Sequence, residues 1–518
     1  MVCTDASTFY RGRVAVTATT SGLWARAAAP TSDAACAEPG AGDAFARGCR
    51  ARLPRVTHSS PHCASRMRPL LIVKSAGVLL YCLAQTAFAV PSFARQTGFE
   101  CTACHVSWPE LTSVGRQFKL GGYTLTRETK EERPWFPTHN DGPPPRLPFA
   151  AMVQASVSDT RNTSNADPTN FPRNDDAVLQ QLSLFYAGRI VDRLGAFAQW
   201  TYDGVAHHSS IDNVDIRYAG QLAGKGVDLD YGVTLNNNPT VSDIYNTTPA
   251  WSFPFASSSV AIAPNAAPLI DGGLGQQVAG LGAYGMWNRT LYTEAAAYRT
   301  ADGAFSIFRA GVDKSTAAVL DGAAPYWRLA LQHVWAEGMH SAMIGTYGIV
   351  ARKFPDSLDP VGPIDRYRDA GIDAQYQYVT DRHRFSTQLN WIDEQQRLDA
   401  TFAAGGASNA TDGLRSFKGK ATYYYDQKYG VTLQYFRTTG SPDDLLYNTG
   451  EPITGSASGS PNSSGVIAEV NWLPVRNLRL LLQYTAYREF NGTRNNYDGH
   501  GRNAKDNDTL YFVAWLML

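Results

Sequence analysis

The sequence predicts an all-β fold: a transmembrane β-barrel of about 16 antiparallel strands, with a small, mostly α-helical or irregular N-terminal segment as its plug. Three observations predict this class. The 518 residues include 45 Gly, 26 Tyr and 22 Phe, at a mean hydropathy of −0.27. From residue 149 onward, apolar and polar residues alternate with period two. The segments between these runs are alternately long and short.

The charge balance excludes a nucleic-acid surface. Lys plus Arg and Asp plus Glu number 46 each, so no broad basic patch is expected. Downstream of residue 105, no apolar run is long enough for a transmembrane helix.

The first 89 residues divide into a leader and a signal peptide. Residues 67–89, MRPLLIVKSAGVLLYCLAQTAFA, have the basic start, the apolar stretch and the small-residue end of a signal for export by the Sec pathway. Residues 1–66 are rich in Ala and Arg and contain no Lys. A transit peptide is one interpretation of this leader. The preferred one is an over-extended gene model, with translation starting at Met67.

Residues 90–148 are expected to form a haem segment. Five of the seven cysteines lie in the leader or the signal peptide, so the mature chain keeps only Cys101 and Cys104. Together with His105 they form the C-x-x-C-H pattern of covalent haem c attachment, in which two thiols bind the porphyrin and the imidazole binds the iron. A thioredoxin-like pair or half a zinc site would need a βαβ setting or a second ligand pair, and neither pattern is present.

The stretch that follows, PELTSVGRQFKLGGY, predicts one short helix from Pro109 to Gly121-Gly122. Arg116 and Lys119 on it are candidates for contacts with haem propionates, or they form a solvated face. The segment is too short to build a core around a haem, so we expect it to lie inside the barrel, with the haem within the membrane's thickness.

The barrel is expected over residues 149–518. Strand alternation is clear in VDLDYGVTL (227–235) and in TLYFVAWLML (509–518). Seventeen candidate strands can be marked, but long and short connections alternate only if 305–313 belongs to a loop. That leaves 16 strands, the even number that bacterial barrels require, with short periplasmic turns and long outer loops such as 203–212 and 236–278. A β-sandwich would not require this alternation.

Two residues are candidates for the second axial ligand of the haem iron. Met152 lies on the lumen-facing side of the first predicted strand, and His139 lies in the Pro-rich linker before it. Either is a candidate distal ligand, and Met/His ligation would raise the reduction potential. Alternatively, Met152 only packs against the plug.

Weaker candidates lie on predicted outer loops. His207-His208 and the acidic stretch 496–508 could attract a metal cation, although solvated loops are the simpler interpretation. No nucleophile–base arrangement is present, so no catalytic residue is expected beyond the haem.

Three segments resemble a known family. These are FARQTGFECTACHVSWPELTSVGRQFKLGGYTL, LSLFYAGRI and NNNPTVSDIYNTTPAWSFPF. They look like the bacterial outer-membrane fusions of a monohaem c-type cytochrome with a porin, relatives of the outer-membrane iron-oxidising cytochromes. The resemblance covers residues 90–518. It implies covalent haem at Cys101 and Cys104, His105 as proximal ligand, and electron transfer across the outer membrane.

The expected function follows from motif, barrel and resemblance together. A monomer in outer-membrane lipid would take electrons from an extracellular donor such as Fe(II) and pass them to a periplasmic c-type cytochrome or cupredoxin. If it is an enzyme, it is an oxidoreductase of the Fe(II):cytochrome c type. The alternatives are a porin-like channel in which the haem is structural, and a haem-based sensor.

Overall fold

The computed structural model describes residues 91–126, 147–162, 174–224, 226–310 and 318–518. The predicted leader, the signal peptide and His139 lie outside these ranges. Within them, no helix has both the length and the apolar character needed to cross a membrane.

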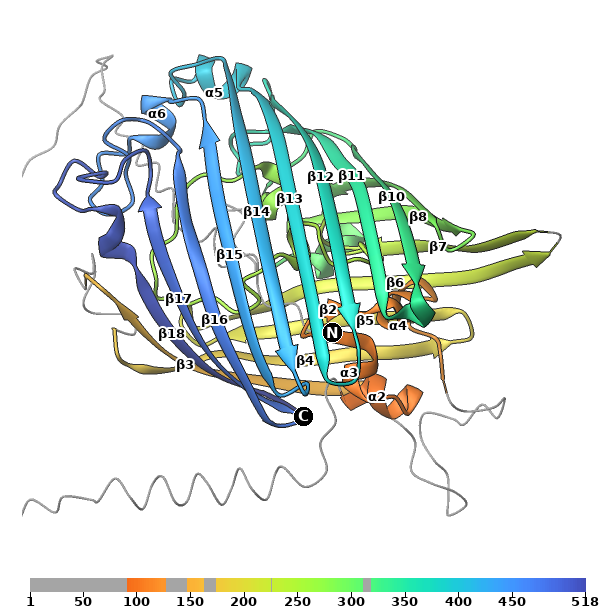
Figure 1. The fold of residues 1–518 in the computed structure, drawn as a ribbon. Coiled ribbons are helices and arrows are strands. Elements are labelled where there is room, and N and C mark those ends of the chain that lie inside the picture. Colours follow the sequence, from red (N-terminus) through yellow and green to blue (C-terminus); the bar gives the residue numbers. More distant parts are fainter. Residues whose placement is uncertain (1–90, 127–146, 163–173, 225, 311–317) are drawn as a thin grey trace, which may run out of the picture. The chain divides into compact units, whose positions relative to one another are not determined.

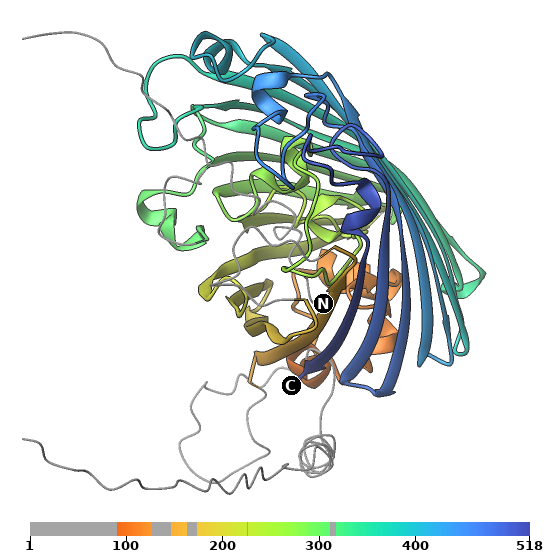
Figure 2. The same cartoon turned by 90° about the vertical axis from the view of Figure 1, so that its left-hand side faces the viewer.

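The described chain folds into a closed barrel of 16 antiparallel strands, which confirms the predicted barrel and its strand number. Consecutive strands are neighbours throughout, and β18 pairs with β3 to close the ring (Figures 1 and 2). The strands are β3 (Phe149–Thr160), β4 (Ala177–Val191), β5 (Leu194–Asp203), β6 (His208–Gly224), β7 (Val227–Asn236), β8 (Val278–Trp287), β9 (Leu291–Thr300), β10 (Ala324–Trp335), β11 (His340–Lys353), β12 (Asp365–Val379), β13 (His383–Arg397), β14 (Thr411–Tyr425), β15 (Tyr429–Gly440), β16 (Ser463–Val475), β17 (Leu478–Glu489) and β18 (Thr509–Met517).

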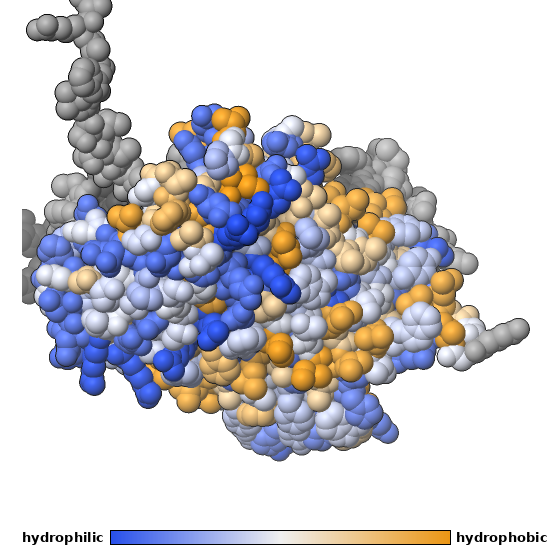
Figure 3. All heavy atoms as spheres, turned by 90° about the horizontal axis from the view of Figure 1, so that it is seen from above, coloured by the Kyte–Doolittle hydropathy of each residue, from blue (hydrophilic) through white to orange (hydrophobic). Residues whose placement is uncertain are grey.

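Alternation decides which side chains face the lumen. On β7, Val227 and Val233 are exposed on the outer face, whereas Asp230 and Thr234 are buried on the inner one. The outer faces of many strands carry exposed apolar residues, among them Leu184, Leu281, Leu329, Ile344, Ile372, Leu389, Leu433, Val470, Leu482 and Phe512. Exposed aromatic residues mark the strand ends beside the short turns, including Trp287, Trp335, Tyr425, Tyr429 and Trp472. Seen from above, hydrophobic residues gather on one part of the surface and hydrophilic ones on another (Figure 3).

Connections follow the predicted order of long and short, with two differences. Residues 305–310, the described part of the predicted loop segment 305–313, lie in a connection as predicted, and Gly303–Phe308 form a 3₁₀ helix there (η4). The predicted long loop 203–212 is wrong, because residues 208–211 pair with β5 and only residues 204–207 connect the two strands. The remaining short elements are η2 (Pro249–Trp251), η3 (Leu269–Gly273), η5 (Ala336–Gly338), α5 (Asp399–Ala403), α6 (Asp444–Tyr447) and η6 (Ala504–Asn507).

The second difference is the connection between β7 and β8, residues 237–277. We predicted an outer loop, but residues 237–251 are all buried and bond to inward-facing strand residues. For example, the side-chain amides of Gln388 and Asn390 on β13 donate to the backbone oxygens of Asn246 and Thr247. Only two charged residues, Asp243 and Asp271, occur in 237–277. This scarcity of charge was the sequence signal for an inward loop.

The N-terminal segment contains α2 (Pro91–Thr97), α3 (Cys101–Cys104), β1 (His105–Ser107), β2 (Glu110–Leu111) and α4 (Ser113–Leu120). The predicted helix start at Pro109 is wrong, because β1 and β2 pair with each other and α4 begins only after them. Thr112 caps α4 by accepting a hydrogen bond from the backbone N–H of Gly115 at 3.3 Å. The helix ends as predicted, with Gly121 at its C-cap and Gly122 at a φ of +66°.

Candidate functional site

The C-x-x-C-H residues form one tight unit with α4. Cys101–Cys104 make a single helical turn, and the backbone N–H of Thr112 donates to the carbonyl oxygen of Cys104 at 2.9 Å. Gly115 lies so close that a Cβ atom there would be 2.2 Å from that same oxygen. Only glycine therefore allows α4 to lie directly against the cysteine turn.

A cavity with about 420 Å³ of empty space opens beside this turn. Both cysteines line it with half-buried thiols that form no disulfide, and the buried imidazole of His105 lines it too. Burial raises the pKa of the Cys104 thiol to about 11. Burial is also the main reason that the pKa of His105 lies well below its usual range. The imidazole is therefore neutral, the form that binds a metal ion.

These residues fit a haem c. The other walls of the cavity are largely apolar or aromatic, from Phe93, Ala94, Phe99, Leu111 and Phe118, with Thr97 and Glu100 as the polar groups. Such walls suit the faces of a porphyrin ring. Among the described residues, the buried Nδ1 atom of His105 has no hydrogen-bond partner. A buried polar atom of this kind needs a partner, which a water molecule or a bound group can supply.

Barrel side chains hold the backbone of this segment. Arg384 on β13 donates from Nη1 to the carbonyl oxygens of Thr102 and His105, at 2.5 and 2.6 Å. Arg479 on β17 donates to the carbonyl oxygen of Trp108 at 3.0 Å. Four more side chains donate hydrogen bonds to backbone oxygens of the segment. They are Asn246 to Pro109, Gln377 to Leu111, Arg217 to Lys119 and Tyr284 to Leu120.

A buried ion pair joins the segment to β14. Lys420 Nζ lies 2.7 Å from Glu110 Oε2, and the two side chains are 3% and 0% exposed. Ser386 donates to the other oxygen of Glu110. None of the barrel residues that hold the segment was predicted from the sequence. A charged residue at an inward position beside a short turn was the signal available for Arg384, Lys420 and Arg479.

The predicted contacts of Arg116 and Lys119 lie elsewhere. Arg116 Nη1 donates to Gln377 Oε1 at 2.7 Å and to Gln375 Oε1 at 3.1 Å. Lys119 Nζ donates to backbone oxygens of the inward loop, including that of Val241 at 2.8 Å. Both side chains are buried, so the solvated-face interpretation is wrong. Neither residue lines the cavity beside the cysteines.

Met152 faces the lumen, as the alternation predicted. It is fully buried in a cluster that contains Phe93, Trp108 and Phe118 of the N-terminal segment. Its sulfur accepts a contact from Gln154 Nε2 at 3.6 Å. Met152 packs in the same cluster as Phe93 and Phe118, which line the cavity, but it is not itself a lining residue. Its role as distal ligand stays a prediction, as does that of His139, which lies outside the described residues.

The motif lies at the short-turn end of the barrel. Arg384 follows the turn between β12 and β13, and Arg476, in the turn between β16 and β17, is 2.7 Å from Glu100. In Figure 1, α2, α3 and α4 are at this end, opposite α5 and α6 of the long loops. Residues 101–105 are therefore near one mouth of the barrel and not at its centre.

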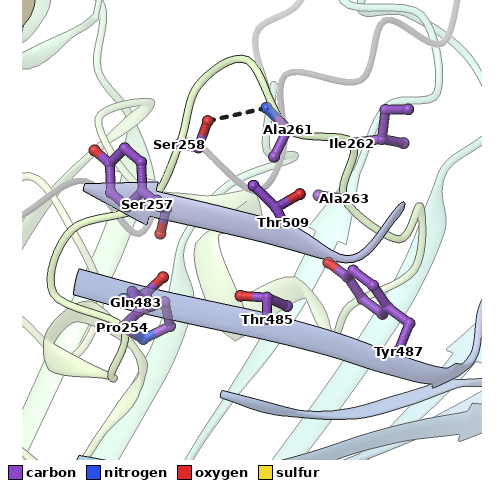
Figure 4. A pocket seen from close by; sticks show the side chains of 11 residues that line it. Pro254, Ser257, Ser258, Ala261, Ile262, Ala263, Gln483, Thr485, Tyr487 and Thr509 are labelled. Atoms are coloured by element: carbon purple, nitrogen blue, oxygen red, sulfur yellow. Dashed lines mark hydrogen bonds between the residues drawn. The ribbon is translucent and has the colours of Figure 1, made fainter. Parts of the chain in front are cut away.

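The inward loop is tied to the wall by buried charges. Asp243 accepts hydrogen bonds from the backbone of Tyr245 and Thr247, and its Oδ1 is 3.2 Å from Arg328 Nη2. Arg328 in turn pairs with Asp373 on β12 at 2.5 Å. Between the loop and β17–β18, towards the long-loop end, a second cavity has about 460 Å³ of empty space. Its lining includes Gln483, Thr485 and Tyr487, which follow one strand in Figure 4, and no charged side chain.

The weaker metal candidates have structural partners. Asp498 accepts hydrogen bonds from the backbone N–H groups of Ile453, His500 and Arg502, which tie two outer loops together. His207 Nδ1 is 3.4 Å from the hydroxyl of Tyr202. Among the described residues, no group of three or more His, Cys, Asp or Glu side chains is placed to hold a metal ion.

Comparison with known proteins yields solved structures alone. No family model and no curated protein sequence matches the chain. OprB of Pseudomonas putida is similar at 11% identity and a TM-score of 0.41, over 71% of this chain and 94% of that one. The outer membrane channel DcaP of Acinetobacter baumannii is similar at 10% identity and a TM-score of 0.39, over 71% and 96% of the two chains. OmpF of Salmonella typhi, in complex with daunomycin, is similar at 14% identity and a TM-score of 0.39, over 71% of this chain and 97% of that one.

The location of the protein follows from its own barrel. A closed ring of strands leaves no unpaired backbone edge, which is the condition for strands to cross a bilayer. The outer face is apolar, aromatic residues mark the short-turn end, and buried polar groups fill the lumen. The chain is therefore a porin-like β-barrel protein of the bacterial outer membrane.

Proposed function

We propose that the protein is a monohaem cytochrome c–porin fusion that carries electrons across the outer membrane. The observation that carries the proposal is the C-x-x-C-H turn, with its half-buried thiols and buried neutral imidazole beside an open cavity. The hydrogen bonds from the barrel to the backbone of residues 102–120 support a plug that is fixed in place. The family resemblance of residues 90–518 agrees with this function.

Each residue has a defined part in holding the cofactor. Cys101 and Cys104 would bind the porphyrin covalently, and His105 would bind the iron on the proximal side. Met152 or His139 would supply a sixth ligand. When bound, the haem supplies a one-electron redox centre. The buried ion pair of Glu110 and Lys420 fixes the N-terminal segment to β14.

The position of the motif indicates the electron acceptor. Short turns of outer-membrane barrels face the periplasm, so a cofactor at the short-turn end is within reach of a periplasmic c-type cytochrome or cupredoxin. The electron donor would approach from the long-loop side. Fe(II) is the proposed donor; the family resemblance implies electron transfer across the outer membrane and no particular donor.

The test combines potentiometry with rapid mixing. The purified, haem-loaded protein should show one covalent haem whose absorption changes to the reduced form within a stopped-flow experiment with Fe(II). Its midpoint potential should lie above that of the iron couple under the same conditions. A C101A/C104A variant provides the control, because it keeps the barrel and loses covalent attachment. Absence of covalent haem would contradict the cytochrome, and a haem unreactive with Fe(II) would exclude this donor alone.

The β7–β8 connection, residues 237–277, favours a second candidate function, that of a solute channel. Residues 237–277 narrow the lumen, and the uncharged cavity beside the loop provides space on the long-loop side. Planar-bilayer conductance separates the two functions. A current that is equal in the wild type and in C101A/C104A supports a channel in which the haem is structural.

A further inference from the structure

Four buried cationic side chains of the barrel strands contact the N-terminal segment, and one of them differs from the others. Three are paired with carboxylates: Arg217 with Asp215 at 2.8 Å, Lys420 with Glu110 at 2.7 Å and Arg479 with Glu469 at 2.7 Å. The fourth is Arg384, which makes no ion pair within 4 Å among the described residues. It is nevertheless only 5% exposed.

The contacts of Arg384 all lead to the haem motif. Its Nη1 donates to the carbonyl oxygens of Thr102 and His105, at 2.5 and 2.6 Å, and its buried Nε has no partner among the described residues. The charged group that acts on it is Asp381, which is exposed to solvent in the preceding turn. Burying a cation without a carboxylate partner costs free energy, which hydrogen bonds to neutral carbonyl groups offset only in part.

The charge of Arg384 is felt at the iron-binding side chain. Arg384 Nη1 lies 2.6 Å from the carbonyl oxygen of His105 and the side chain is only 5% exposed, so its positive charge is held beside the iron-binding residue. A positive charge in a poorly screened site disfavours any further positive charge nearby. Reduction removes one positive charge from a haem iron, so a fixed cation beside the proximal ligand favours the reduced state.

We propose that Arg384 is a positioning residue that fixes the haem motif to β13 and raises the reduction potential of the haem held there. The proposal rests on the proposed function, because it requires a haem on Cys101, Cys104 and His105. It links the barrel wall to the redox property of the plug.

The experiment compares Arg384→Gln, Arg384→Lys and Arg382→Gln in the full haem-loaded protein at low ionic strength. Midpoint potentials come from spectroelectrochemical titration, and haem content comes from the pyridine haemochrome spectrum. Arg384→Gln should shift the redox equilibrium constant about tenfold towards the oxidised form, which is about 59 mV for a one-electron couple. Arg384→Lys keeps the positive charge, so its midpoint potential should stay close to that of the wild type. Arg382→Gln removes an exposed charge of the same turn and should lower the potential by much less than Arg384→Gln, because water screens an exposed charge.

The midpoint potentials of these variants decide whether Arg384 raises the potential. An unchanged potential in a haem-loaded Arg384→Gln protein overturns the proposal. If Arg384→Gln fails to fold or to attach haem, Asp381→Asn replaces it, because that change leaves the buried contacts in place. Removal of the carboxylate that acts on Arg384 must then raise the potential, and a potential that stays or falls overturns the proposal. Wild-type protein without covalent haem would instead contradict the proposed function.

Discussion

Removal of Lys420 should loosen the plug without unfolding the barrel. Lys420 Nζ is 2.7 Å from Glu110 Oε2, and the two side chains are 3% and 0% exposed. The Lys420→Met substitution therefore leaves Glu110 as a buried carboxylate without its cation. Breaking such a pair costs about 3–5 kcal/mol. Since 1.36 kcal/mol is a factor of ten, opening of the segment should become roughly 10²–10⁴ times more frequent.

Hydrogen exchange measured by mass spectrometry reads this opening directly. In membrane nanodiscs, peptides covering residues 105–120 should exchange faster in Lys420→Met by that factor, while peptides from the barrel strands should keep their protection. The double variant Glu110→Gln/Lys420→Met should lose less protection than Lys420→Met, because no uncompensated charge remains.

A surface lysine provides the control. Lys428, in the turn after β14, pairs with Asp426 at 3.4 Å, and these side chains are 56% and 50% exposed. Lys428→Met should cost at most about 1 kcal/mol. Unchanged protection of residues 105–120 in Lys420→Met would refute the view that buried charge seats the plug.

Three further predictions concern the haem turn, the distal ligand and the outer loops. Gly115→Ala should lower the yield of covalent haem, because its Cβ would lie 2.2 Å from the carbonyl oxygen of Cys104; a haem stain on purified protein measures the yield, and a wild-type yield would contradict the tight packing. Met152→Ala should cost about 2–5 kcal/mol of stability as a packing residue, and it should also lower the midpoint potential if the thioether binds the iron. Retention of the near-infrared thioether band in that variant would exclude Met152 as a ligand. For Asp498, burial opposes ionisation, but three backbone N–H groups outweigh it and hold the pKa below its usual range. This group therefore stabilises the outer loops above about pH 4, the pKa of an unfolded Asp, and the contribution is lost as the pH falls through the lower folded value. Limited proteolysis at pH 3 and pH 6 should show the loop opening only at the lower pH, whereas Asp498→Asn should be cleaved at both.

Local patterns in the sequence determined much of this protein. Strand alternation and loop length depend on neighbouring residues, so 16 strands, the alternation along β7 and the inward direction of Met152 are all confirmed. The C-x-x-C-H motif can be recognised in the sequence for the same reason, because its chemistry lies in five consecutive residues.

Tertiary structure alone decided how the lumen is filled. Arg479 is 371 residues from Trp108 along the chain, and Lys420 is 310 residues from Glu110. No periodicity of a single strand reports which distant carbonyl or carboxylate its inward side chain will meet. The same limit explains the errors at Arg116 and at residues 237–277, where helix pattern and loop length were read as signs of exposure. Burial there is set by a closed barrel, whose lumen exists only after the first and last strands have paired.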